Sequence, residues 1–246
     1  MLRLLKYELR KTMLAKLILL AVTLTAQAVF LVGLWGKRDI PLAIGAFLLF
    51  VIATNGIVLM GILSVITLHR DTNTKLGYML FMTPNSCYRI LGAKVIECAV
   101  SILLAGAFFF ALGWLDFSLL LGQGANEEIW NMFTEMVKAI NSKIVLDVPH
   151  ISALVFSMLA FWLCTITTAY LADVLSSSLL YGKKANWLVT IPLFILLNWG
   201  ISKLLTLIPS SIGTIPCMVW QGVAALALAG GMYVVTARLM EKYLSV

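Results

Sequence analysis

The sequence predicts an all-α, polytopic membrane protein with six transmembrane helices. Of the 246 residues, 61% are hydrophobic and only 12% are charged, whereas soluble proteins contain about 45–50% apolar and about 25% charged residues. The mean hydropathy is +1.00. Apolar runs long enough to cross about 30 Å of hydrocarbon occur six times. A transmembrane β-barrel is excluded, because its strands alternate apolar and polar residues and never form such runs.

The predicted spans form a single transmembrane domain over residues 1–246. They cover residues 17–36, 42–68, 95–115, 151–172, 187–208 and 217–237. The first run contains Ala26-Gln27-Ala28, which is similar to a signal-peptide cleavage site. We still expect a span here, because the apolar run continues to Trp35 and the basic region before it is longer than that of a signal peptide.

The basic residues predict the orientation of the spans. Counted on alternate sides, 13 of the 18 Lys and Arg residues fall on the side of the two termini, the second loop and the fourth loop. Because basic residues accumulate in cytoplasmic loops, we expect a multi-pass protein of the plasma membrane with both termini in the cytoplasm. The net charge of +7 does not indicate a nucleic-acid partner, since the charges lie in short clusters between apolar runs.

Residues 1–16 predict an amphipathic helix in the cytoplasmic membrane interface. Apolar residues recur there at helical spacing, at Leu2, Leu5, Leu9 and Met13. Basic residues occupy the other faces, where they suit anionic lipid headgroups. The alternative is a simple positive-inside anchor.

A second amphipathic helix is expected on the outer side, over residues 126–148. Asn126 is a suitable N-cap, and Glu127 and Glu128 suit the positive end of the helix dipole. An apolar stripe follows at Ile129, Phe133, Met136 and Ile140. Two interpretations stay open, a structural lid on the bundle and a direct contact with a substrate.

The loop 69–94 is the longest segment on the predicted cytoplasmic side. Thr72 or Asn73 can cap a short helix there, and Pro84 stops it. That helix would present an apolar surface formed by Leu76, Met79, Leu80 and Phe81. An apolar helix that does not span the membrane needs a cover, and a docking soluble protein is the natural candidate.

The N-terminus and this loop resemble those of the membrane subunits of ABC-2-type exporters. The similar features are the basic segment 5–11, the six spans, and a first cytoplasmic loop with Asp71, Gly77, Pro84, Arg89 and Gly92-Ala93-Lys94. In that family the loop forms a coupling helix, which sits in a groove of a separate ATPase. Two features depart from the family: Asp71 stands where Glu is common, and the region between the third and fourth spans is longer than a plain turn.

The resemblance implies a permease subunit of an ATP-driven exporter. It implies ATPase-coupling roles for Asp71, Lys75, Leu76, Gly77, Met79, Leu80, Phe81, Pro84 and Arg89. The implied partners are a cytoplasmic ABC ATPase and a second permease subunit, identical or different. The expected substrate is amphipathic, with a secreted cytolytic or antimicrobial peptide as the first choice and a lipid or a drug as alternatives. A membrane channel or a non-transporting immunity protein is the alternative from another class.

The chain is not expected to hydrolyse ATP itself. A phosphate-binding loop needs Gly-x-x-x-x-Gly-Lys followed by Ser or Thr, and neither Gly182-Lys183-Lys184 nor Gly92-Ala93-Lys94 has this pattern. ATP and Mg would therefore bind to the partner ATPase, and no cofactor is expected here. No metal site or intramembrane metalloprotease is expected either, because the cysteines lack paired spacing and His69 and His150 are predicted on opposite sides of the membrane.

Polar residues within the spans are further candidates for function, because such residues are costly in lipid. Glu97 is expected either to pair with Lys94 or Arg70 or to act in gating. Asn55 and Asn198 are expected either to form interhelical hydrogen bonds or to line a substrate path.

Two further patterns predict placement and packing. Asp173 follows the fourth span and is expected in the membrane interface. In the last span, the pairs Ala225/Ala229 and Ala227/Gly231 have the spacing of small residues that lets helices approach closely.

Overall fold

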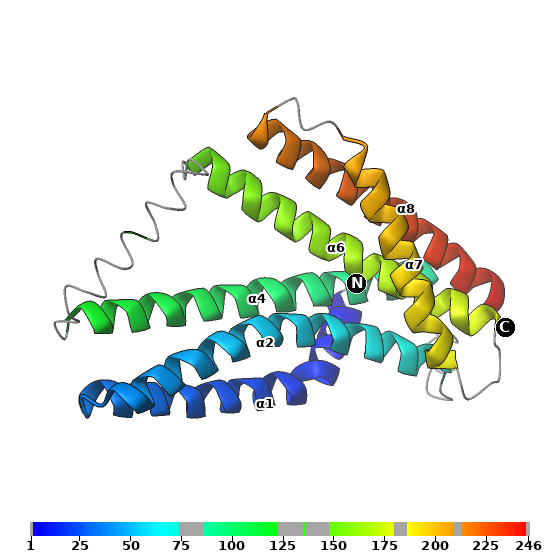
Figure 1. Cartoon of the computed structure of the whole chain (residues 1–246). Coiled ribbons are helices and arrows are strands. Elements are labelled where there is room, and N and C mark those ends of the chain that lie inside the picture. The colour runs from blue at the N-terminus through cyan, green and yellow to red at the C-terminus, as the bar shows by residue number, and fades with distance from the viewer. Residues whose placement is uncertain are drawn as a thin grey trace. The chain divides into compact units, whose positions relative to one another are not determined.

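Six long helices make up the described part of the chain in the computed structural model, which covers residues 2–73, 86–122, 135, 148–179, 186–208 and 213–244 (Figure 1). They are α1 (Leu2–Trp35), α2 (Asp39–Asn73), α4 (Cys87–Gly122), α6 (Val148–Leu179), α7 (Asn186–Thr206) and α8 (Thr214–Leu244). The described residues form no strand, so the all-α prediction is confirmed for them. All six helices are long and apolar enough to cross a membrane.

The first helix is longer than the span predicted for it. α1 continues without a break from Leu2 to Trp35, where we expected two elements, residues 1–16 and 17–36. Residues 11–20 contain no Gly or Pro, and most of them are good helix formers. Nothing in the sequence therefore stops the helix at the edge of the apolar run.

Two predicted elements lie mostly outside the described residues. α2 extends to Asn73 and α4 begins at Cys87, so both helices reach into the predicted loop 69–94. The rest of that loop, including the expected coupling helix, is outside the described part of the chain. The same holds for the expected outer helix 126–148, apart from Glu135 and Val148.

A tight turn joins α1 to α2. Arg38 N donates to the carbonyl of Gly33 at 3.1 Å, and Lys37 N donates to that of Leu34 at 3.4 Å. These are the two bonds of a Schellman motif. Its left-handed residue, which is usually Gly, is Lys37 here, with a φ of 47°. Asp39 then stands in the first turn of α2, where its charge suits the helix dipole.

Two glycines allow α1 and α2 to pack backbone against backbone. A Cβ atom added at Gly33 would lie 2.4 Å from the nitrogen of Leu42. One added at Gly45 would lie 2.5 Å from Cα of Phe30. Atoms cannot approach each other so closely, so the antiparallel pair depends on glycine at both positions (Figure 1).

The helices form two compact units. One consists of Met1–Leu5, Ser64–Ile96 and Leu146–Val246, and the other of Lys6–Leu63 and Glu97–Val145. We call the first the α6–α8 unit, because it holds α6, α7 and α8 together with the end of α2 and the start of α4. We call the second the α1–α2–α4 unit, which holds the remainder of those three helices.

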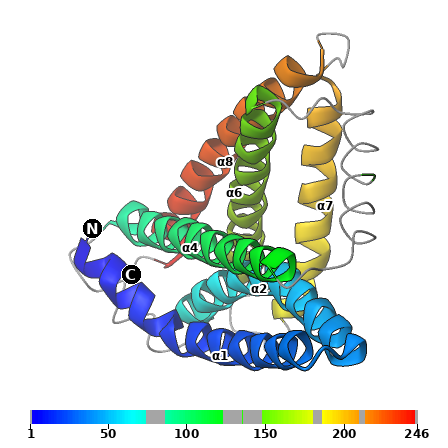
Figure 2. The same ribbon diagram turned by 90° about the vertical axis from the view of Figure 1, so that its left-hand side faces the viewer.

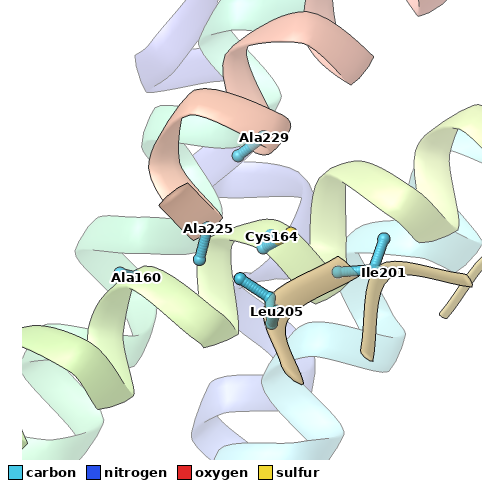
Figure 3. Close-up of a cluster of buried hydrophobic side chains, with 6 residues drawn as sticks. All are labelled: Ala160, Cys164, Ile201, Leu205, Ala225 and Ala229. Atoms are coloured by element: carbon cyan, nitrogen blue, oxygen red, sulfur yellow. The ribbon is translucent and has the colours of Figure 1, made fainter. Parts of the chain in front are cut away.

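Apolar side chains, small ones on α6 and α8 and larger ones on α7, form a core in the α6–α8 unit, where α6 packs against both α7 and α8 (Figure 2). The core residues are Ala160 and Cys164 of α6, Ile201 and Leu205 of α7, and Ala225 and Ala229 of α8 (Figure 3). The predicted packing of Ala225 and Ala229 is therefore confirmed. Ala227 and Gly231 are exposed instead. Two residues turn a helix by about 200°, so both pairs cannot face the same neighbour.

Large apolar side chains are exposed along all six helices. Examples, one from each helix, are Leu14, Phe50, Phe110, Met158, Leu196 and Val235. A soluble monomer rarely exposes so many apolar groups, whereas a lipid-facing surface requires them. The exposed surface therefore fits a membrane protein.

A proline interrupts the hydrogen bonding of one helix. Pro192 lies inside α7, which nevertheless continues to Thr206. Proline has no N–H group, so the carbonyl of Leu188, four residues earlier, loses its usual helical donor.

Candidate functional site

Buried polar side chains gather where α2 ends and α4 begins, on either side of residues 74–85, which are outside the described residues. We call this group the loop-base network. It consists of His69, Asp71, Thr72, Lys94 and Asp173. Asp71, Lys94 and Asp173 are only 8%, 1% and 1% exposed. Ionisable groups away from water are costly unless they are paired, so we treat the network as the candidate functional site.

An ion pair connects the two ends of the loop. Lys94 Nζ of α4 lies 2.6 Å from Asp71 Oδ2 of α2, and the lysine side chain is 1% exposed. At this distance the contact is both an ion pair and a charge-assisted hydrogen bond. It holds the start of α4 against the end of α2.

A second carboxylate connects the end of α2 to α6. Asp173 Oδ1 lies 2.6 Å from Nδ1 of His69, and Asp173 Oδ2 accepts a hydrogen bond from Thr72 Oγ1 at 3.4 Å. The expectation that Asp173 ends its span is thereby corrected, whereas its place in the membrane interface stays a prediction. α6 continues to Leu179, and Asp173 is buried because His69 and Thr72 satisfy its oxygens.

Hydroxyl groups extend the connection on both sides of Asp173. The hydroxyl groups of Ser64 on α2 and Tyr170 on α6 share a hydrogen bond. Ser176 on α6 is hydrogen-bonded to Thr190 on α7 at 2.6 Å. One face of α6 therefore contacts α2 through Tyr170 and Asp173 and contacts α7 through Ser176.

The start of α4 also contacts α8. Tyr233 Oη of α8 donates a hydrogen bond to the carbonyl of Tyr88 at 2.6 Å. The two rings meet edge to face, with centroids 6.4 Å apart. Both ends of the loop are thus held by the α6–α8 unit, α2 by α6 and α4 by α8.

A separate polar cluster lies in the α1–α2–α4 unit, around Glu97. The carboxylate is 3% exposed. Its Oε1 accepts hydrogen bonds from Lys16 Nζ at 2.7 Å, Thr12 Oγ1 at 2.8 Å and Ser101 Oγ at 2.9 Å. Lys16 and Thr12 belong to α1, so the cluster joins α1 to α4.

The expected pairing of Glu97 with Lys94 or Arg70 is therefore wrong. Lys94 and Glu97 are three residues apart on α4, but Lys94 forms its ion pair with Asp71. Glu97 bonds to Lys16 instead. The local i, i+3 spacing suggested a pair within one helix, and tertiary packing gave each charge a partner on a different helix.

The two asparagines make no interhelical hydrogen bond with any described residue. Asn55 is exposed, and its amide donates to the carbonyl of Val51 in its own helix at 2.8 Å. It lines an apolar groove of about 390 Å³ between α1 and α2. Asn198 is half-buried on α7. The interhelical role that we expected is thus not found, and their place in a substrate path stays a prediction.

Two of the residues expected to couple to an ATPase are described. Asp71 is buried in the loop-base network, and Arg89 is exposed at the start of α4. The other expected coupling residues, Lys75, Leu76, Gly77, Met79, Leu80, Phe81 and Pro84, lie outside the described residues.

Sequence reasoning missed the polar face of the first helix. Glu8, Thr12 and Lys16 are spaced four residues apart, and Glu8 and Thr12 are 3% and 5% exposed. Residues four apart share one helix face, so this stripe was visible in the sequence beside the apolar one. Glu97 and Ser101 have the same spacing on α4, and the two stripes meet.

Six apolar helices joined by buried polar networks define the chain as a multi-pass membrane protein. Comparisons with protein-family models, with curated proteins and with solved structures found no match.

Proposed function

We propose that the chain is the permease subunit of an ATP-driven ABC-2-type exporter in the plasma membrane, with both termini in the cytoplasm. It works with a second permease subunit and with a separate cytoplasmic ATPase, which binds ATP and Mg. The transported substrate is amphipathic, and a secreted cytolytic or antimicrobial peptide is the first choice. Lipids and drugs are the alternatives.

The loop-base network is the observation that supports this proposal most strongly. A loop that receives a push from an ATPase needs both of its ends fixed to helices that must move. Here the Asp71–Lys94 ion pair fixes the two ends to each other, and the His69–Asp173 contact fixes them to α6. A loop that only connects two spans has no need of buried charges.

The network suggests a path for the movement. ATPase closure would displace the segment 72–84, and the Asp71–Lys94 pair would make the ends of α2 and α4 move together. Asp173 would pass this movement to α6, which packs on both α7 and α8. Such a chain of contacts can shift a bundle between inward-facing and outward-facing states.

The docking surface is tested with Leu80→Asp combined with Phe81→Asp. The permease is co-expressed with the ABC ATPase of its gene neighbourhood and purified through a tag on the permease. We expect the wild type to retain the ATPase and the double variant to lose it, because two charges replace the apolar contact surface. Unchanged co-purification and unchanged ATPase stimulation would contradict the proposal, and ion currents without ATP would favour a channel.

The transmission step is tested with Asp173→Asn, which keeps the size of the side chain and removes its charge. We expect this variant to bind the ATPase normally and to lose substrate-stimulated turnover in liposomes by roughly tenfold, within the usual range of coupling energies. Ser152→Ala on the same helix is the control, because that hydroxyl is exposed and, among the described residues, bonds only to the carbonyl of Pro149. Equal turnover in both variants would exclude transmission through Asp173.

A further inference from the structure

The α1–α2–α4 unit holds a further cavity, which is separate from the groove at Asn55. It has a volume of about 380 Å³ and is bounded by side chains of α1, α2 and α4. This size falls within the range of small-molecule sites, about 300–1,000 Å³. Its walls are apolar and include Phe30, Phe50, Phe109 and Phe117.

Among the described residues that line this cavity, Asp116 of α4 is the one with an ionisable side chain. Its Oδ1 accepts a hydrogen bond from Nε2 of Gln27 on α1. No basic side chain among the described residues forms an ion pair with it. Within the described part of the chain, a half-buried carboxylate among phenyl rings therefore has no counter-charge.

Gln27 is bonded to this carboxylate but is not among the residues that line the cavity. Its side chain is only 8% exposed, and its Oε1 is buried without a hydrogen-bond partner among the described residues. The amide turns its N–H₂ group to Asp116, because an ionised carboxylate can only accept hydrogen bonds. Oε1 is then left facing no donor, which is costly for a buried oxygen.

We propose that this cavity binds a lipophilic cation, that is, an apolar or aromatic body that carries a positive charge and N–H donors. Asp116, which lines the cavity, supplies the counter-charge and accepts hydrogen bonds from the ligand. The phenyl rings contact the apolar body and favour a cation over an anion. That this ligand is also the transported substrate rests on the proposed function. In that case the expected amphipathic substrates are narrowed to those with a positive charge.

The charge requirement is tested by titrating ethidium, an aromatic cation with N–H donors, against the permease alone. The protein is held in phosphatidylcholine nanodiscs, which carry no net charge, and binding is followed by fluorescence polarisation. Asp116→Asn keeps the side-chain size and is expected to weaken binding by about tenfold. Asp39→Asn, an exposed acidic position in the same unit, is expected to leave the affinity unchanged.

The cavity itself is tested by filling it. Gly113 lines the cavity, and a Cβ atom there would meet nothing within 4 Å. The Cβ atom of Gly113→Leu therefore has room, and the larger side chain is expected to occupy the cavity and abolish ethidium binding. Gly106→Leu is the matched control, because Gly106 is on the same helix, is equally open and does not line the cavity. Monodisperse elution of both variants verifies that they fold.

Several outcomes would overturn the proposal. Equal binding of ethidium by the wild type, Asp116→Asn and Gly113→Leu would mean that ethidium partitions into the lipid, or that a lipid acyl chain fills the cavity. Equal affinity for the anionic probe anilinonaphthalene sulfonate would contradict the charge assignment. If a second copy of the chain covers the cavity, the wild type binds no ethidium and Gly113→Leu splits the dimer in mass photometry.

The titration keeps this proposal separate from the exporter proposal. It contains neither ATP nor ATPase, so its result does not depend on transport. Ethidium binding that requires Asp116, in a permease that recruits no ATPase, would support the site and contradict the exporter. ATP-driven transport that survives both Asp116→Asn and Gly113→Leu would contradict only the site.

Discussion

At the scale of single residues, the contact with the strictest requirement for both side chains is the buried ion pair of Asp71 and Lys94. Removing two charges from a polar solvent costs more than a modest Coulomb attraction returns, so buried pairs often add little net stability. Removing one partner is different, because it takes the 2.6 Å counter-charge away from the other buried group. The pair is therefore expected to specify how the helix ends meet rather than to add stability.

Single substitutions at this pair should destabilise the protein more than the double substitution. We expect Asp71→Leu and Lys94→Met to lower the free energy of unfolding by about 3–5 kcal/mol each. The double variant should lie closer to the wild type, because neither charge of this pair remains. Thermal unfolding in detergent, followed by tryptophan fluorescence, measures the difference. A double variant as unstable as the sum of the single variants would contradict this view.

Lys37 offers a stabilising substitution at the same scale. A non-glycine residue in the left-handed region costs about 1–2 kcal/mol, and Lys37 has a φ of 47°. Lys37→Gly should therefore stabilise the α1–α2 turn, by about 0.5–1 kcal/mol after the greater freedom of glycine in the unfolded chain is counted. Lys37→Ala is the control, because it removes the charge and keeps the strain. If both variants gave the same unfolding temperature, backbone strain would not be the cause.

At the scale of elements, the α1–α2 pair is the most constrained part of the structure. The Schellman motif fixes the turn, and Gly33 and Gly45 fix the distance between the backbones. Neither helix can shift without breaking one of these contacts. The pair is therefore expected to behave as a rigid body.

Adding one methyl group should disturb this pair. Gly45→Ala places a Cβ atom 2.5 Å from Cα of Phe30, which the backbone cannot tolerate without moving. We expect a loss of about 1–3 kcal/mol in unfolding free energy, typical of overpacking. Gly106→Ala, where a Cβ atom meets nothing within 4 Å, should be neutral or slightly stabilising. An equal response in both variants would mean that the helices adjust freely.

The sequence predicted the elements better than their ends. Hydropathy identifies each helix because the apolar runs are long. It reports which residues favour lipid, however, and not where the helical hydrogen bonds begin and end. α1 begins at Leu2 although the apolar run begins at residue 17, since a helix stops at a breaker and residues 11–20 contain none. The sequence also did not show which face of the last helix is buried. Ala225/Ala229 and Ala227/Gly231 have the same spacing, but only the first pair is buried.

The site was less predictable than the elements, for a physical reason. The expected Lys94–Glu97 pair came from spacing within one helix, whereas two of the three partners of Glu97, Thr12 and Lys16, come from a different helix. His69 and Asp173 are 104 residues apart and share no local pattern. Buried charges choose partners by tertiary packing, so a single sequence shows that partners are needed and not which ones they are.

At the scale of the whole molecule, the asymmetry of basic residues predicts the orientation in the membrane. Three of the four cysteines, Cys87, Cys98 and Cys164, are buried, so Cys217→Ser gives a background of low reactivity. In that background we expect Lys37→Cys to react with a membrane-impermeant maleimide added to intact cells. Glu241→Cys should react only after lysis. Both positions are exposed, so burial does not decide the result.

Reversed labelling would contradict the predicted orientation and with it the cytoplasmic position of the loop 69–94. Labelling of both positions in intact cells would mean a mixed orientation. Neither result is compatible with an ATPase docking on the segment 72–84.

The proline of α7 has a consequence for the kinetics of the bundle. Because Pro192 donates no hydrogen bond to Leu188, the first turns of α7 are attached to the rest of the helix by fewer bonds than a regular helix provides. Segments held in this way open locally at a lower free energy than the global unfolding. In deuterium exchange, the amides before Pro192 should lose protection well before those after it, so α7 contains two cooperative segments within one continuous helix.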